Sequence, residues 1–350
     1  MKLFCGAAAA WLLVPGCFAA QDLSAPGWFQ KGLTESDGGK WSQAAACFRN
    51  AIALSPGYVA AHLELGDVSL RLGDFDQAEE ELDTVLRLDA RNAGAHYGLG
   101  MIRLQEGNFA GAETEFRRTL ELKSDFGPAE EYLGVTLVQQ HKWPEARRVL
   151  EHALAVNPDS LAATNAYATA LASLGDQAGA ADEFQKAREL SRRQIALNRA
   201  QGEVTRGLEL WHFGKPQEAA AAFRASIQAK PDYPDAHNNL GSLLLFLGDT
   251  DGAVEQFSIT IKLRPAFALA HYNLARALIK KEDLPQAESE LRKTILLDPR
   301  MARAHIDLGV LLAAKGNNLS SDARAELNEG LRLDPQLKSS IPPEYLRNLR

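Results

Sequence analysis

A 34-residue period runs through most of this chain, and it constrains the fold more than any other feature. In residues 234–267 the period contains two short segments with apolar residues at helical spacing. The first segment ends at Gly248, because glycine readily adopts the left-handed conformation found at helix C-termini. The second stops before Pro265, because proline cannot continue a helix. The period therefore predicts pairs of short amphipathic helices stacked along the chain.

Two positions of the period require small side chains. With residue 234 as position 1, position 8 is glycine or alanine in nine successive units: Gly32, Gly66, Gly100, Gly134, Ala168, Gly207, Gly241, Ala275 and Gly309. Position 20 is alanine in every unit: Ala44, Ala78, Ala112, Ala146, Ala180, Ala219, Ala253, Ala287 and Ala323. We expect the two helices of each pair to cross at these residues, where a larger side chain would overpack the contact.

The pattern resembles the signature of the tetratricopeptide repeat family, a helix-turn-helix unit of 34 residues. The residues that carry the resemblance are Leu240, Gly241, Leu244, Ala253, Phe257 and Pro265, and equivalent residues cover about nine tenths of the chain. The resemblance implies an all-α, right-handed superhelical solenoid of about nine repeats. Repeats 1 to 5 would occupy residues 21–194, and repeats 6 to 9 residues 200–335.

Five extra residues, 195–199, separate the two groups of repeats. The surrounding stretch 188–206 has no proline and one glycine, so it predicts one continuous, longer helix. The insertion is either a joint between two arrays or a tolerated insertion without consequence. Residues 336–350, with a short helix at 344–350, are a candidate C-terminal cap, because the end of a repeat array needs a polar outer surface.

The first twenty residues have the pattern of a secretory signal peptide: Lys2, an apolar core over residues 3–14, and small residues before a cleavage site after Ala19. An apolar N-terminal helix that stays attached is the simple alternative. Another is lipidation at Cys17, because residues 14–17 resemble a bacterial lipobox, although Pro15 departs from it. We therefore expect an exported protein, periplasmic or secreted, or alternatively a membrane-anchored lipoprotein. No later apolar run is long enough to span a membrane.

Composition and motifs argue against several classes of function. The net charge of -7 lacks the basic excess typical of nucleic-acid binders. Beyond the signal segment Cys47 is the single thiol, so no internal disulfide can form, and we expect this residue to be buried. Phosphate-binding loops, nucleophile elbows and HExxH motifs are absent from the sequence, so we predict no cofactor, no metal and no enzymatic activity.

Histidines recur at position 4 of the period, as in His62, His96, His237, His271 and His305. Zinc needs nitrogen ligands about 2 Å from one centre. Equivalent residues of stacked helices are separated by roughly one helix contact, about 8–10 Å, so these imidazoles cannot converge. We expect them to pack inside the repeats.

The resemblance implies that the first helix of each pair lines a concave groove. Asparagine amides can both donate to and accept from an extended peptide, and aromatic side chains can anchor it. The predicted groove residues are Asn165, Trp211, Asn238, Asn239, Ser242, Tyr272, Asn273, Arg276 and Arg303. The alternative for Trp211 is packing between repeats, since its position in the period is apolar in every unit after the first.

Three hypotheses for function follow. The leading one is a non-enzymatic scaffold outside the cytoplasm that binds a protein or an extended peptide in the groove. The second is a lipid-anchored assembly factor for an envelope machine. The third is an enzyme or a carbohydrate binder with an unrecognised site. A binder of acidic chaperone tails is disfavoured, because the lysines of the charged clamp that some family members use are missing.

Overall fold

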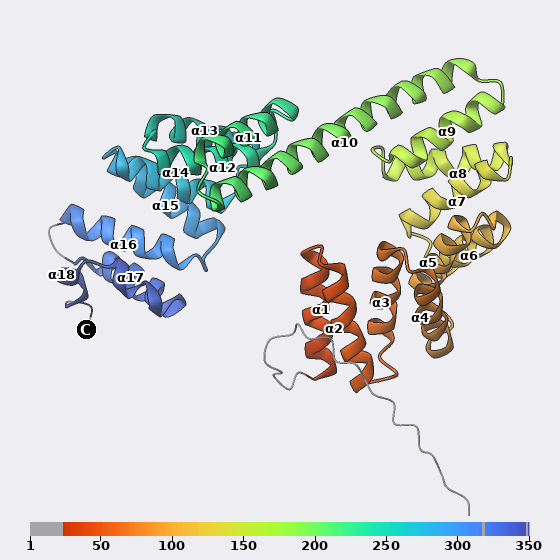
Figure 1. Cartoon of the computed structure of the whole chain (residues 1–350), viewed down its shortest axis with the longest axis horizontal. Coiled ribbons are helices and arrows are strands. Elements are labelled where there is room, and N and C mark those ends of the chain that lie inside the picture. The colour runs from red at the N-terminus through yellow and green to blue at the C-terminus, as the bar shows by residue number, and fades with distance from the viewer. Residues whose placement is uncertain (1–23, 317–318, 348, 350) are drawn as a thin grey trace, which may run out of the picture. The chain divides into compact units, whose positions relative to one another are not determined.

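The computed structural model describes residues 24–316, 319–347 and 349, and all the elements within these ranges are helices (Figure 1). Contacts divide the chain into two units, residues 1–190 (unit 1) and 191–350 (unit 2), which we describe separately. The predicted signal segment with Cys17, and the two extra residues Asn317 and Asn318, lie outside the described residues.

Unit 1 is a series of antiparallel helix pairs, and each second helix also packs on the first helix of the next pair. Its helices are α1 (Ala25–Asp37), α2 (Trp41–Leu54), α3 (Val59–Leu72), α4 (Phe75–Leu88), α5 (Ala93–Gln105), α6 (Phe109–Leu122), α7 (Gly127–Gln139), α8 (Trp143–Val156), α9 (Leu161–Ser173) and the start of α10 (Gln177–His212).

Unit 2 repeats the same packing. It contains the rest of α10, α11 (Pro216–Ala229), α12 (Pro234–Leu247), α13 (Thr250–Leu263), α14 (Ala268–Lys280), α15 (Leu284–Leu297), α16 (Ala302–Gly316), α17 (Ser321–Leu333), the 3-10 helix η1 (Pro335–Ser340) and α18 (Pro343–Leu346). The predicted solenoid of helix pairs is confirmed.

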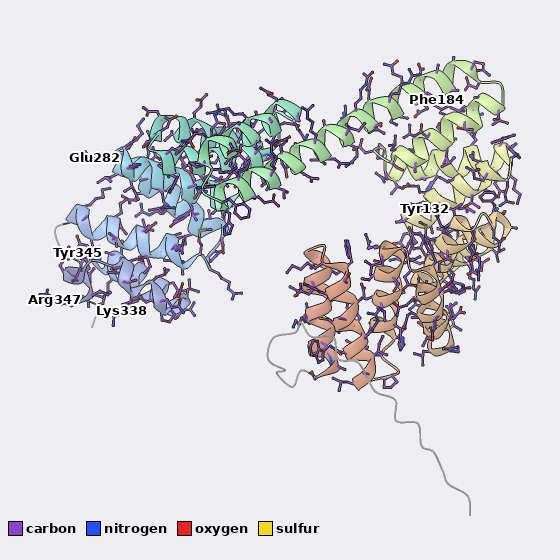
Figure 2. All side chains as sticks on the ribbon, in the orientation of Figure 1. Tyr132, Phe184, Glu282, Lys338, Tyr345 and Arg347 are labelled. Carbon is purple, nitrogen blue, oxygen red and sulfur yellow. The ribbon has the colours of Figure 1, made fainter. Side chains whose placement is uncertain are left out.

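Residues at the turn inside each pair explain why the helices start and stop there. Asp249 caps α13, because its carboxylate accepts from the Gly252 N–H at 2.9 Å. The predicted left-handed glycines are confirmed, for example Gly248 with φ of 93° after α12. His141 and Glu282 occupy the same turn position without being glycine, and both have positive φ, 60° and 61°. Figure 2 labels Glu282.

The predicted helix crossings are confirmed by the packing of the small residues. Every alanine at position 20 of the period is at most 2% exposed. A Cβ added to Gly241 would lie 2.8 Å from the ring of Phe257, and one added to Gly207 would lie 2.5 Å from Phe223. Both phenylalanines are fully buried. The core of each unit is therefore a column of aromatic and leucine side chains that pack on glycine or alanine.

The predicted continuous helix across the insertion is also confirmed, as the 36-residue α10. Its residues 192–195 are all exposed, including Ile195 at 63%. Phe184, labelled in Figure 2, lies on the earlier part of the same helix. A hinge at 195–199 stays a prediction.

The C-terminal segment differs from its prediction. Within the described residues the predicted helix at 344–350 covers Pro343–Leu346, and η1 precedes it, while residues 348 and 350 lie outside the described residues. Ile341 has extended backbone because the following proline disfavours helical conformation there. Its side chain is 3% exposed and packs with Ile306 and Leu327 at the end of unit 2. Figure 2 labels Lys338, Tyr345 and Arg347 on this segment.

Candidate functional site

The first helices of unit 2, α12, α14 and α16, are joined by hydrogen bonds between their side chains. The Asn273 amide on α14 donates to Asn238 Oδ1 on α12 at 3.1 Å. The first helices α12 and α14 also contact each other directly, whereas no comparable contact joins the second helices α13 and α15 among the described residues. The first helices therefore lie on the inner side of this unit's curve. On the other side, Lys281 donates to Asp251 on α13.

We call the side chains that these three helices expose between them the inner face of unit 2. It comprises Asn239, Ser242, Phe246, Asn273, Arg276, Lys280, Arg303 and Asp307.

An amide pair organises the middle of the inner face. Asn238 is only 5% exposed, and its Oδ1 accepts from Asn273. Asn273 Nδ2 also lies 3.4 Å from the hydroxyl of Ser242, which donates to the Asn238 carbonyl at 2.9 Å. Asn239 is half-buried, and its side chain has no hydrogen-bond partner among the described residues. Of the predicted asparagines on α12, Asn238 is therefore used by the fold and Asn239 is available to a ligand.

A buried phenol links α14 to α16. Tyr272 is 7% exposed, and its hydroxyl donates to Asp307 Oδ2 at 3.0 Å. Burial, followed by the charge of Asp307, raises the pKa of Tyr272, so the phenol keeps its proton for this bond. Burial likewise raises the pKa of Asp307, against the opposing effects of Tyr272, Arg276 and Arg303. Arg276 lies over the Tyr272 ring, with its guanidinium carbon 5.8 Å from the centroid.

A pocket of about 550 Å³ opens beside this cluster, between α14 and α16. Arg276, Lys280 and Asp307 supply its polar groups. The rest of its wall is Ile279, Leu284, Val310, Leu311, Ala314 and Ser340. Sequence reasoning missed this pocket, because Leu284 and Ser340 come from outside the first helices and only the fold brings them here.

Two aromatic residues lie at the end of the inner face nearest α10. Trp211 is half-buried and packs on the core of unit 2, which confirms the alternative that it belongs partly to the core. Its ring centroid lies 5.9 Å from that of Phe246, which is 68% exposed. Phe246 thus presents an apolar anchor whose orientation Trp211 supports.

The remaining predicted groove residue, Asn165, belongs to unit 1. It is exposed on α9, and its amide donates to the Leu161 carbonyl at 3.0 Å. The first helix α3 of unit 1 carries acidic groups: burial and then Asp67 raise the pKa of Glu64, and Asp67 pairs with Arg71 at 2.8 Å.

The formal charges of the two units differ in sign. Residues 1–190 hold 16 Lys and Arg against 26 Asp and Glu, a net charge of -10. Residues 191–350 hold 22 against 19, a net charge of +3. The two units therefore carry net charges of opposite sign, which favours potentials of opposite sign around them.

The recurrent histidines have the predicted packing role. His271 is 5% exposed, its Nδ1 lies 2.5 Å from Glu290 Oε2, and its Nε2 lies 2.9 Å from the Pro265 carbonyl. His62, His237 and His305 make the same two contacts, with glutamine replacing glutamate for His237. The recurrent acid or amide 19 residues after each histidine, or 21 after His305, is a sequence signal that could have identified the partner.

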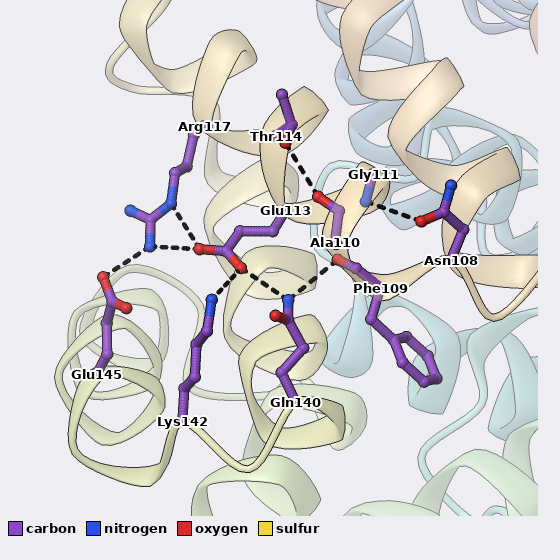
Figure 3. A network of polar contacts seen from close by, with 10 residues as sticks. All are labelled: Asn108, Phe109, Ala110, Gly111, Glu113, Thr114, Arg117, Gln140, Lys142 and Glu145. Atoms are coloured by element: carbon purple, nitrogen blue, oxygen red, sulfur yellow. Dashed lines mark hydrogen bonds and ion pairs between the residues drawn. The ribbon is translucent and has the colours of Figure 1, made fainter.

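A polar network in unit 1 joins α6 to the turn before α8 (Figure 3). Glu113 accepts from Arg117 at 2.9 Å, from Gln140 at 2.7 Å and from Lys142 at 2.6 Å. Burial opposes ionisation of Glu113, but these donors outweigh it and lower its pKa. The donors satisfy the carboxylate, so the network serves the packing of consecutive pairs.

Within residues 24–316, 319–347 and 349, no group of three or more His, Cys, Asp or Glu side chains is arranged to hold a metal ion. None of the helices in that part of the chain combines the length and apolar character needed to cross a bilayer. Cys47 is buried, as predicted.

Several solved structures are similar to this chain. A crystal structure of MamA is 22% identical with a TM-score of 0.41, and the match covers 47% of this chain and 96% of that one. YrrB, described as a TPR protein with an unusual peptide-binding site, is 20% identical with a TM-score of 0.35, covering 65% and 96%. The Cut9–Hcn1 hetero-tetramer of APC/C is 15% identical with a TM-score of 0.38, covering 90% and 74%. No curated protein matches the sequence.

A family model matches most of the chain. It is the tetratricopeptide repeat model, and it matches residues 29–76, 63–125, 133–194, 204–266, 240–292 and 272–337. These ranges contain the helix pairs and the small-residue crossings described above. The chain therefore belongs to the tetratricopeptide repeat family.

Proposed function

We propose that this protein is a non-enzymatic scaffold that binds an extended segment of a partner protein along the inner face of unit 2. One observation carries the proposal: Asn239, Phe246 and Arg276 expose an amide without a hydrogen-bond partner, an aromatic ring, and a cation without an ion-pair partner among the described residues. Their neighbours hold them in place, because Asn238, Trp211 and Tyr272 are fixed by contacts between helices. A row of mixed donors, acceptors and apolar anchors suits a peptide backbone with side chains on either side.

Site-specific photocrosslinking in the native host tests the proposal. A benzophenone amino acid replaces Phe246 on the inner face, and in a matched control it replaces Leu296, which is 81% exposed on α15. Both sites are exposed and apolar, so non-specific adhesion affects them equally. We expect one recurrent partner peptide to be crosslinked from position 246 and not from 296, identified by mass spectrometry. Equal crosslinking from both positions would remove the inner face as the binding surface.

We further propose that the protein works outside the cytoplasm. The support is the N-terminal pattern of Lys2, the apolar stretch 3–14 and the small residues before position 20, which is typical of exported proteins. Intact-mass measurement of the native protein decides among the alternatives. Loss of the first nineteen residues indicates a soluble exported chain, an added lipid that disappears in Cys17→Ser indicates an anchored one, and an intact, unmodified N-terminus contradicts both.

A further inference from the structure

The pocket between α14 and α16 combines an apolar floor with cations on one side. Ile279, Leu311 and Ala314 supply aliphatic surface, while Arg276 and Lys280 project from successive turns of α14. Its volume of about 550 Å³ lies within the range of about 300–1,000 Å³ typical of ligand sites. This is enough room for one large apolar side chain together with polar groups beside it.

The two cations form no ion pair within the described residues, although Arg276 lies over the Tyr272 ring and acts on the charge of Asp307. Within the described residues neither Arg276 nor Lys280 has a carboxylate within ion-pair distance, and the Lys280 ammonium has only the Leu245 carbonyl, at 3.4 Å. The neighbouring lysines on the other side of the helix pairs differ, because Lys281 pairs with Asp251 and Lys315 with Glu288. Inner cations therefore remain available to a ligand.

Neighbouring side chains partly offset the charge of Asp307, the single carboxylate in the pocket wall. Asp307 Oδ2 accepts from the Tyr272 hydroxyl at 3.0 Å, and Arg303 and Arg276 both act on its charge. Two cations, Arg276 and Lys280, and one carboxylate line the pocket, and Arg303 acts on that carboxylate from outside the lining. The net charge of +3 for residues 191–350 has the same sign. A cationic ligand segment is consequently disfavoured here.

We infer that this pocket binds a segment of a partner protein in which a large apolar residue is flanked by acidic residues. The apolar side chain enters between Ile279 and Leu311, and the flanking carboxylates pair with Arg276 and Lys280. The inference rests on the proposed function and adds to it the chemistry of the partner. It uses residues of α14 and α16 that differ from the predicted amide positions Asn239 and Asn273.

Fluorescence anisotropy with the full chain tests the inference. The probes are short peptides with a central leucine flanked by glutamates, the same peptide with glutamines or lysines for the glutamates, and the same peptide with alanine for leucine. We expect the glutamate–leucine peptide to bind most tightly. Its affinity should fall about 3- to 10-fold in the double variant Arg276→Gln/Lys280→Gln, because exposed ion pairs are weak. This fall should be smaller at high salt, because salt screens the ion pairs.

Three further variants separate local effects from general ones. Lys281→Gln removes a neighbouring charge outside the pocket and should leave binding unchanged. Ala314→Leu adds volume at an exposed position of the pocket wall and should weaken binding. Asp307→Asn removes the one carboxylate and should strengthen it. Circular dichroism of each variant checks that it is folded.

The outcomes distinguish failure of this inference from failure of the proposed function on which it rests. If the glutamate and lysine peptides bind alike, or Lys281→Gln weakens binding as much as the paired substitution, the acidic–apolar assignment is wrong even where position 246 still crosslinks a partner. If a single-stranded oligonucleotide of the same charge competes with the same dependence on Arg276 and Lys280, the pocket is a general polyanion site and the inference also fails. Loss of crosslinking at 246 alone would contradict the scaffold surface instead.

Discussion

A glycine packed against an aromatic ring recurs at the helix crossings of this fold. Gly241 lies so close to Phe257 that an added Cβ would be 2.8 Å from the ring. We predict that Gly241→Ala lowers the unfolding free energy by about 1–3 kcal/mol through overpacking, although alanine favours the helix itself. Urea denaturation measures the difference.

A control for this prediction is present in the chain, because the next pair has Ala275 and Leu291 at the equivalent positions, both fully buried. Gly241→Ala/Phe257→Leu should therefore be more stable than the sum of its single variants. A strictly additive double variant would show that the steric contact is not the cause.

The buried carboxylate of Asp307 should make stability depend on pH. Burial raises its folded-state pKa above the unfolded value, so its neutral form is favoured by folding. The resulting contribution to stability is complete below the unfolded pKa of about 3.9 and is lost as pH rises through the folded pKa. We predict that Asp307→Asn, which keeps an acceptor for Tyr272, removes this loss and is more stable than the wild type near neutrality.

The measurement is denaturation of both proteins across the acidic range. Asp232 provides a control of opposite sign, because the bond from Lys230 lowers its pKa and its contribution is instead lost as pH falls. An unchanged pH profile in Asp307→Asn would mean that this group does not couple to folding.

At the scale of elements, the sequence predicts helix positions well because few residues set them. Gly248, Pro265 and the alanine at position 20 act locally, so the start, end and crossing of a helix follow from identity and spacing. The short η1 before α18 is not predictable in this way, because Ile341 takes its place through long-range packing on Ile306 and Leu327.

The candidate site was only partly predictable for the same reason. Spacing places Asn238 and Asn239 on one first helix, but it does not distinguish the residue that pairs with Asn273 from the one that stays available. The pocket depends on Leu284 and Ser340, which meet only after the pairs stack.

The buried histidines link each first helix to its second helix and to the loop before it. His271 contacts both Glu290 and the Pro265 carbonyl, whereas His96 contacts Glu115 and its buried Nε2 has no partner among the described residues. We predict that His271→Ala lowers the unfolding free energy by about 2–4 kcal/mol, because the partly buried bonds to Glu290 and to the Pro265 carbonyl are both lost. His96→Ala should have about half that effect, and thermal denaturation of both variants gives the comparison. Equal losses would contradict the role of the carbonyl contact.

At the scale of the whole molecule, stability should be local to each unit. In a repeat array each pair contacts only its neighbours, so damage spreads through shared interfaces. Residues 192–195 of α10 are exposed and bury little apolar surface, so they should transmit little cooperativity between units 1 and 2. Leu150 and Phe257, each fully buried, lie in different units.

Leu150→Ala should lower the unfolding free energy by about 2–5 kcal/mol. We predict that it lowers amide hydrogen-exchange protection across α5–α9 and leaves the protection of α12–α16 unchanged. Phe257→Ala should lower protection across α12–α16 and leave α5–α9 unchanged, with a fall in unfolding free energy of about 3–5 kcal/mol. Hydrogen exchange read by mass spectrometry resolves the two regions in one experiment. If either substitution lowered protection equally in both regions, the units would unfold as one cooperative body, and α10 would transmit stability despite its exposed middle.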